Sequence, residues 1–171
     1  NGSGRNYIQF ANADTTGNFS DFGDLTSTRR VPIVISSRVF GHICGGYVSN
    51  YTANCDRVTF ASTGNAVDSG IDLTAAKYNG GRISDATRGI AVDSDFITIS
   101  TLGNAADFGD LIGTRTPNAG ASSNAIRGIV MGGAAPGPVA SNSNTIEFIT
   151  IATLGNGQDF GDLNGSRGDG A

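Results

Sequence analysis

The chain of 171 residues contains no tryptophan, and it has only one methionine and one histidine. Glutamate and lysine, which favour helix surfaces, occur once each, as Glu147 and Lys77. Glycine is abundant, with 26 residues, and the acidic residues are otherwise aspartates, which favour turns. No apolar run approaches the length of a membrane-spanning helix, so membrane insertion is not expected. The composition therefore predicts an all-β protein.

Positive charge is also scarce and dispersed. The formal net charge is −4, and the arginines are spread along the chain, so nucleic-acid binding through a basic patch is not expected. The single histidine, His42, excludes metal sites that need two or more histidines. No G-x-S-x-G string accompanies it as a nucleophile motif. We expect His42 to be a strand residue and the protein to have no catalytic activity.

One string of residues recurs four times along the chain. Its general form is T/S-x-G-N-x-x-D-F-G-D-L-x-x-x-R, and it covers residues 15–29, 62–77, 101–115 and 153–167. The second occurrence has one extra residue and carries Ser69 in place of the phenylalanine. A period of roughly 40–50 residues indicates a repeat architecture. We expect a single repeat domain over 1–171, with repeats of approximately 1–29, 30–77, 78–115 and 116–167.

Each repeat offers four short strands. The strands that precede the strings are expected at 7–11, 57–60, 96–100 and 146–151, where apolar and β-branched residues mix. The Phe-Gly-Asp-Leu segment is expected to return as a short strand that ends near a basic residue, namely Arg29, Lys77, Arg115 and Arg167. Two more strands per unit are expected at 31–35 and 38–46, 81–84 and 88–92, and 120–123 and 127–133. Repeated four-stranded units predict β-propeller blades.

Two resemblances follow from these strings. One part of the chain resembles a kelch blade: it has Arg-Gly-Ile-Val-Met-Gly-Gly at 127–133, then an apolar strand, and then Phe-Gly-Asp-Leu with a basic residue four positions further on. Kelch repeats usually carry Trp at the positions of Phe22, Phe108 and Phe160. The third repeat departs from this pattern, because Asp93-Ser94 replaces the Gly-Gly pair. More narrowly, IEFITIATLGN and DFGDL resemble repeats of virion structural and appendage proteins of tailed, especially marine, bacteriophages. The resemblance implies a kelch-like β-propeller in a virion or extracellular setting.

The expected strands amount to three blades plus a half blade. An open propeller exposes sheet edges, which are prone to pairing. We therefore expect either a longer chain or an oligomer in which neighbours supply the missing strands. The expected partners are other virion proteins or copies of the protein itself.

Acidic and basic residues recur in the strings. The acidic ones form D-x-G-D pairs, with one residue inserted in the second pair: Asp21 and Asp24, Asp68 and Asp72, Asp107 and Asp110, and Asp159 and Asp162. One Ca²⁺ ion per pair is one interpretation, but two carboxylates provide few ligands, so turn capping is preferred and no metal or cofactor is expected. The basic residues of the strings, with Arg38, Arg88 and Arg127, are expected to pair with the aspartates between blades rather than to line an anion channel.

The stretch from Gly45 to Asn54 is the candidate binding loop. It is flanked by Cys44 and Cys55, which either form a disulfide or remain as two buried thiols. The loops between second and third strands, at 45–54, Asp93-Ser94 and 134–144, vary most between repeats, and such loops commonly carry binding function. Tyr47, Tyr51, Asn50 and Asn54 are candidates to stack on and hydrogen-bond a host surface glycan; a merely solvated loop is the alternative.

Three functions are consistent with this sequence. The first is a non-enzymatic virion structural or host-recognition protein, such as part of a tail fibre, which acts through many weak contacts. The second is a secreted or cell-surface carbohydrate-binding lectin that uses the same loops. The third is a kelch-type scaffold for protein–protein interaction.

Overall fold

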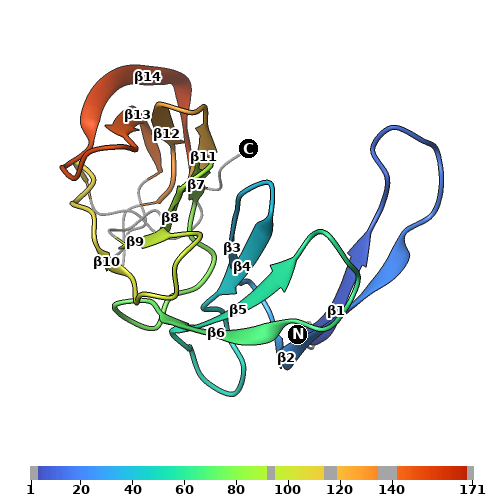
Figure 1. The fold of residues 1–171 in the computed structure, drawn as a ribbon. Helices are drawn as coiled ribbons and strands as arrows, with labels where there is room; N and C mark the ends of the chain where they lie inside the picture. Colours follow the sequence, from blue (N-terminus) through green and yellow to red (C-terminus); the bar gives the residue numbers. More distant parts are fainter. Residues whose placement is uncertain (1–3, 92–94, 114–118, 135–141, 169–171) are drawn as a thin grey trace.

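The computed structural model describes residues 4–91, 95–113, 119–134 and 142–168. These residues form fourteen strands in four antiparallel sheets and no helix, so the all-β prediction is confirmed. The sheets follow one another along the chain and lie around an open arc, from blue to red in Figure 1. The described residues do not close this arc into a ring.

Each sheet is formed by consecutive strands. The first has two: β1 (Arg5–Phe10) and β2 (Ser20–Arg29). The second has four: β3 (Ile33–Ser36), β4 (Phe40–Cys44), β5 (Asn54–Thr59) and β6 (Val67–Asp72). The third has β7 (Arg82–Ser84), β8 (Arg88–Ala91), β9 (Asp95–Thr98) and β10 (Ala106–Asp107). The fourth has β11 (Gly120–Ser123), β12 (Arg127–Met131), β13 (Ser143–Thr150) and β14 (Gln158–Arg167).

The hydrophobic core lies between consecutive sheets. In β3, Ile33 and Ile35 are buried while Val34 between them is 38% exposed, because successive side chains of a strand point to opposite faces. Three apolar clusters fill the spaces between neighbouring sheets: one lies between the first and second sheets, one between the second and third, and one between the third and fourth. They include Ile8 with Val58, Ile35 with Ile97, and Ile83 with Val130.

Polar side chains cap the turn between the first two strands of each four-stranded sheet. Ser37 Oγ accepts hydrogen bonds from the backbone N–H groups of Val39 and Phe40. Asp85 and Asn124 act in the same way in the third and fourth sheets, each accepting two backbone N–H groups. These caps satisfy donors that the hairpin leaves unpaired, and they account for a Ser, Asp or Asn at this point of the repeat.

Two return strands are shorter than expected. β2 and β14 reach Arg29 and Arg167, but β6 ends at Asp72 and β10 spans only Ala106–Asp107, so the expectation that they end near a basic residue is wrong for them. Directly after β6, Leu73 is 4% exposed and packs into the core, while its N–H donates to the Ala53 carbonyl at 3.0 Å. In the third sheet, Phe108 is likewise buried, and its carbonyl bonds to the fourth sheet. The Asp93-Ser94 turn and residues 135–141 of the 134–144 loop lie outside the described residues.

Candidate ligand-binding site

Two basic residues of the strings, Arg29 and Lys77, lie against the third strand of the next sheet. Arg29 Nη2 is 3.1 Å from Asp56 Oδ1 on β5, and Lys77 Nζ is 3.2 Å from Asp95 Oδ1 on β9. Both carboxylates are buried. Ion pairs thus join consecutive sheets, but through acids outside the D-x-G-D pairs, which were expected to supply the partners.

Backbone groups share the same buried acids. Asp56 accepts hydrogen bonds from Thr26 N at 2.9 Å and Thr26 Oγ1 at 2.7 Å. Thr74 bonds to Asp95 in the same way, and Ile112 N donates to Glu147 Oε2 at 2.7 Å. All three acids stand eight residues before a string glycine, and this regularity is the sequence signal that would have identified them. Arg115, the string residue that corresponds to Arg29 and Lys77, lies outside the described residues, so its relation to Glu147 is not described.

Two arginines expected in the ion-pair ladder have aromatic neighbours instead. The guanidinium carbon of Arg88 lies 5.2 Å from the ring centre of Phe96, and that of Arg127 lies 4.6 Å from Phe148. Arg88 Nη1 also donates to the Ile151 carbonyl at 3.0 Å. These arginines therefore cover the aromatic residues of the third strands, which favours cation–π contact over ion pairing.

The D-x-G-D aspartates form turn contacts. The first aspartate of a pair accepts a hydrogen bond from the glycine N–H two residues on, as in Asp68, Asp107 and Asp159. The second aspartate donates its own N–H to an asparagine of the next sheet, as in Asp24, Asp72 and Asp110. Asp21 and Asp162 are exposed on β2 and β14. Over the described ranges, no three His, Cys, Asp or Glu side chains come close enough to hold a metal ion.

A disulfide closes the base of the 45–54 loop. Cys44 of β4 and Cys55 of β5 lie directly opposite each other in the sheet, with their Cα atoms 4.0 Å apart, and are bonded through sulfur. Gly45 and Gly46 follow with φ of 62° and 94°, a conformation that glycine adopts without strain. The loop therefore leaves the sheet from a fixed base, as a binding loop requires.

Replacing both cysteines by serine is expected to lower the free energy of unfolding by about 3 kcal/mol, because the cross-link restricts the unfolded chain. Denaturant unfolding of the wild type and of the Cys44→Ser/Cys55→Ser variant measures this difference. Adding a reductant to the wild type should reproduce it, whereas the variant should not respond to reductant. A variant as stable as the oxidised wild type would contradict the expectation.

Three tyrosines, Tyr47, Tyr51 and Tyr78, form a cluster at the loop. The rings of Tyr51 and Tyr78 are stacked, with centres 4.4 Å apart and planes at 11°, and Tyr47 packs edge-on to Tyr51 at 5.4 Å. The guanidinium carbon of Arg30 lies 4.4 Å from the ring centre of Tyr47. A hydrogen bond with Tyr78 raises the pKa of the Tyr51 phenol. Tyr51 is nonetheless half exposed, so part of its ring is available to a ligand.

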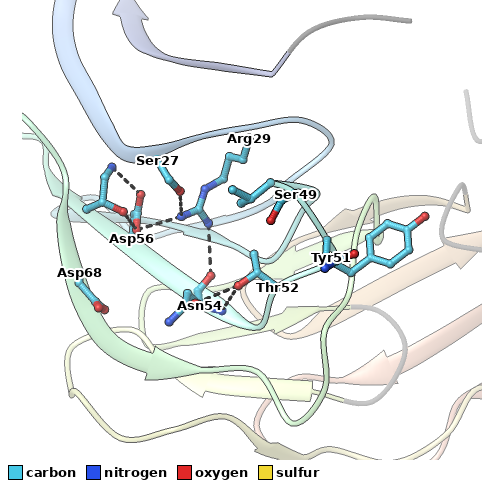
Figure 2. Close-up of a pocket in the computed structure, with 11 residues that line it drawn as sticks. Ser27, Arg29, Ser49, Tyr51, Thr52, Asn54, Asp56 and Asp68 are labelled. Carbon is cyan, nitrogen blue, oxygen red and sulfur yellow. Dashed lines mark hydrogen bonds and ion pairs between the residues drawn. The ribbon is translucent and has the colours of Figure 1, made fainter.

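A pocket of ≈ 390 Å³ opens beside this cluster. Its walls come from β2, the loop, β5 and β6; they are formed by Thr26, Ser27, Arg29, Val48, Ser49, Asn50, Tyr51, Thr52, Asn54, Asp56 and Asp68. In Figure 2 the Tyr51 ring points away from the ion pair of Arg29 and Asp56. The structure thus brings the expected residues Asn50, Tyr51 and Asn54 to one pocket, and it places Tyr47 beside it.

The charged groups of the pocket are engaged within the protein. Arg29 Nη1 donates to the carbonyls of Ile43, Gly45 and Asn54 at 3.2–3.3 Å, and Arg29 also pairs with Asp56. The two side chains therefore hold the loop onto β2 and β5.

The remaining polar groups divide into two sets. Asn54 Oδ1 accepts from Thr52 Oγ1 at 2.9 Å, and Asn54 Nδ2 donates to Asp72 Oδ1 at 3.1 Å, so Asn54 mainly braces the loop. Ser49 and Asn50 are exposed, and their side chains make no hydrogen bond to the described residues. Together with Tyr51 and the exposed carboxylate of Asp68, they can contact a ligand in this pocket.

His42 lies away from this pocket, in the sheet core. It is fully buried on β4, and its Nε2 is 3.1 Å from the carbonyl oxygen of Ile99. Burial lowers the pKa of the imidazole. The side chain is therefore a neutral core residue at physiological pH, in keeping with its expected position in a strand.

Two observations bear on the class of protein. Among the described residues no helix is sufficiently long and apolar to cross a membrane. In comparisons with known proteins, no family model and no curated protein matches this chain.

Proposed function

We propose that this protein is a non-enzymatic recognition protein that binds carbohydrate at the 45–54 loop. The observation that carries the proposal is the half-exposed Tyr51 at the mouth of a polar pocket with unpaired Ser49 and Asn50 side chains. An aromatic ring offers a flat apolar face to the C–H groups of a sugar, while amides and hydroxyls bond to its hydroxyl groups. The pocket volume lies in the range of small-ligand sites.

The loop has the composition of a binding loop. Residues 47–54 read Tyr-Val-Ser-Asn-Tyr-Thr-Ala-Asn, and tyrosine, serine and asparagine are the residue types that antibody binding loops favour. Tyrosine provides a large contact area at low entropic cost, and Ser and Asn adapt their hydrogen bonds. The disulfide between Cys44 and Cys55 reduces the entropy lost when the loop binds a ligand.

We also propose that the four sheets are blades of a kelch-like β-propeller. Three of them have four consecutive antiparallel strands, and apolar clusters join each sheet to the next, as in stacked blades. The resemblance of the strings to repeats of bacteriophage appendage proteins supports a role on a virion, where the protein recognises a host surface. On a particle, many weak sites act together through effective concentration.

A glycan array probed with the purified protein tests the proposed binding. Tyr51→Ala and Asn50→Ala are each expected to reduce binding to a recognised glycan about tenfold or more, through lost ring contact and lost hydrogen bonds. Tyr7→Ala is the matched control, because Tyr7 is an exposed tyrosine on β1 outside the pocket, and it should leave binding unchanged. Absence of any bound glycan, or equal loss in the control, would contradict the proposal.

The setting of the protein is tested separately. A virion component co-purifies with assembled particles, whereas a secreted or cell-surface lectin of cellular origin does not. Mass spectrometry of purified particles distinguishes the two. Absence of the protein from particles, together with retained glycan binding, would replace the virion role with the lectin role.

A further inference from the structure

Consecutive sheets are joined by one recurring set of hydrogen bonds. At the first junction, Gly64 N donates to Phe22 O at 2.7 Å, Ala66 N donates to Asp24 O at 2.8 Å, and Asp24 N donates to Asn65 Oδ1 at 3.0 Å. The corresponding residues make the same three bonds at the third junction: Gly155 with Phe108, Gly157 with Asp110, and Asp110 with Asn156. A Gly-Asn loop of one sheet thus inserts against the Phe-Gly-Asp segment of the preceding sheet.

The Phe-Gly-Asp segment of β14 has no such loop against it within the described residues. Phe160, in the position of Phe108, is 57% exposed, whereas Phe108 is 4% exposed. A Cβ atom on Gly109 would lie 2.6 Å from Gly155, but a Cβ atom on Gly161 would meet nothing within 4 Å. Arg167, at the end of β14, is exposed. We call Phe160, Gly161, Asp162 and Arg167 the acceptor face.

The first sheet carries the opposite half of the junction. Gly17 and Asn18 stand in the positions of Gly64 and Asn65, in the loop between β1 and β2. Phe19, which follows them, is 68% exposed, whereas Ala66 in the corresponding position of the second sheet is 7% exposed. Figure 1 shows this hairpin projecting from one end of the arc, with β14 at the other end. Within the described residues, the 17–19 loop and the acceptor face therefore do not fill each other.

The ion-pair position of the first sheet differs from that of the others. Gln9 lies opposite Asp21, as Asp56 lies opposite Asp68 on β5 and β6. Gln9 is exposed and uncharged. Its amide oxygen can accept a hydrogen bond from an arginine, but it supplies no negative charge. A junction formed with this sheet is therefore complementary in its backbone bonds but lacks the buried ion pair.

We propose that molecules of this protein associate head to tail, with the 17–19 loop of one molecule inserted against the acceptor face of another. Gly17 N then bonds to Phe160 O, Asp162 N bonds to Asn18 Oδ1, and Arg167 reaches Gln9, in the pattern of the internal junctions. Such a contact uses two different surfaces, so it produces a ring or an open filament. The missing charge at Gln9 keeps it weaker than an internal junction. This inference does not depend on glycan binding.

Charge variants of the purified protein test this contact by sedimentation velocity over a wide concentration range. The wild type is expected to form larger species as concentration rises. Gln9→Glu restores the carboxylate and should lower the dissociation constant about tenfold, since a hydrogen bond to a charged group is stronger than one to a neutral amide. Gln9→Lys and Arg167→Glu should each weaken association, and combining them should recover it. Gln158→Glu, the same substitution elsewhere on the surface, is the matched control.

All substituted side chains are exposed, so circular dichroism should show an unchanged fold. A wild type and a Gln9→Glu variant that both remain monomeric at the highest concentration would overturn the proposal. The proposal would also be overturned if Gln9→Lys and Arg167→Glu, alone or combined, left association unchanged. The same holds if Gln158→Glu strengthened association as much as Gln9→Glu. Both rings and filaments agree with it, provided that the charge exchange governs their formation.

Discussion

Replacing Asp56 by alanine is expected to lower the free energy of unfolding by about 3–5 kcal/mol, the usual cost of breaking a buried ion pair. Asp56 and Arg29 have side chains that are only 2% exposed. Without the carboxylate, the Arg29 charge remains buried, and the N–H and hydroxyl of Thr26 lose their acceptor. Equilibrium denaturation of the Asp56→Ala variant measures the loss. The 45–54 loop is expected to loosen as well, since Arg29 donates to its carbonyls.

Asp68→Ala provides the control for this prediction. Asp68 lies directly opposite Asp56 on the neighbouring strand, but it is exposed and accepts a single hydrogen bond, from the Gly70 N–H at 2.9 Å. Its removal should cost no more than about 1 kcal/mol. The double variant Arg29→Met/Asp56→Ala should recover part of the loss, because no unpaired charge is left. Equal losses in Asp56→Ala and Asp68→Ala would show that the buried pair has no special role.

The second large effect is expected for Gly109→Ala. A Cβ atom there would lie 2.6 Å from the backbone of Gly155 in the fourth sheet, so the two sheets must separate. The residue also has φ of 133°, which strains any side chain. Strain and overpacking together should lower the free energy of unfolding by about 2–5 kcal/mol.

Gly161→Ala separates these two causes. Gly161 has φ of 135°, nearly equal to that of Gly109, but nothing lies within 4 Å of its Cβ position. Measured in dilute solution, this variant should show only the strain, about 1–2 kcal/mol. The excess in Gly109→Ala is then the cost of forcing two sheets apart. Equal effects of the two substitutions would mean that the close approach of the sheets contributes little to stability.

Much of the strand arrangement was predictable because its signals are local. In Ile33–Ser36, three consecutive β-branched residues favour a strand, and the repeated strings mark where strands turn. The lengths of β6 and β10 were not predictable in this way. At the ends of these strands, Leu73 and Phe108 enter a core that the neighbouring sheet completes.

The candidate site was predictable only in part, for a similar reason. Tyr51 and Asn50 stand out in a loop between two cysteines, so the sequence alone identifies them. Tyr78, however, belongs to a different stretch of chain and reaches Tyr51 only in the folded protein. The pairing of Arg29 with Asp56 likewise crosses from one sheet to the next. In a single sequence, the buried acids of such pairs are recognisable only because Asp56, Asp95 and Glu147 recur eight residues before a string glycine.

The placement of the apolar clusters between consecutive sheets has a consequence for how the protein unfolds. Each cluster depends on two adjacent sheets, so we expect stability to follow a nearest-neighbour law like that of linear repeat proteins. Among the described sheets, the β1–β2 hairpin has a neighbour on one side only, and it should fray first in hydrogen exchange. The second and third sheets have neighbours on both sides and should exchange slowest. Local cooperativity of this kind also lets a repeat be gained or lost in evolution while the remaining junctions stay intact.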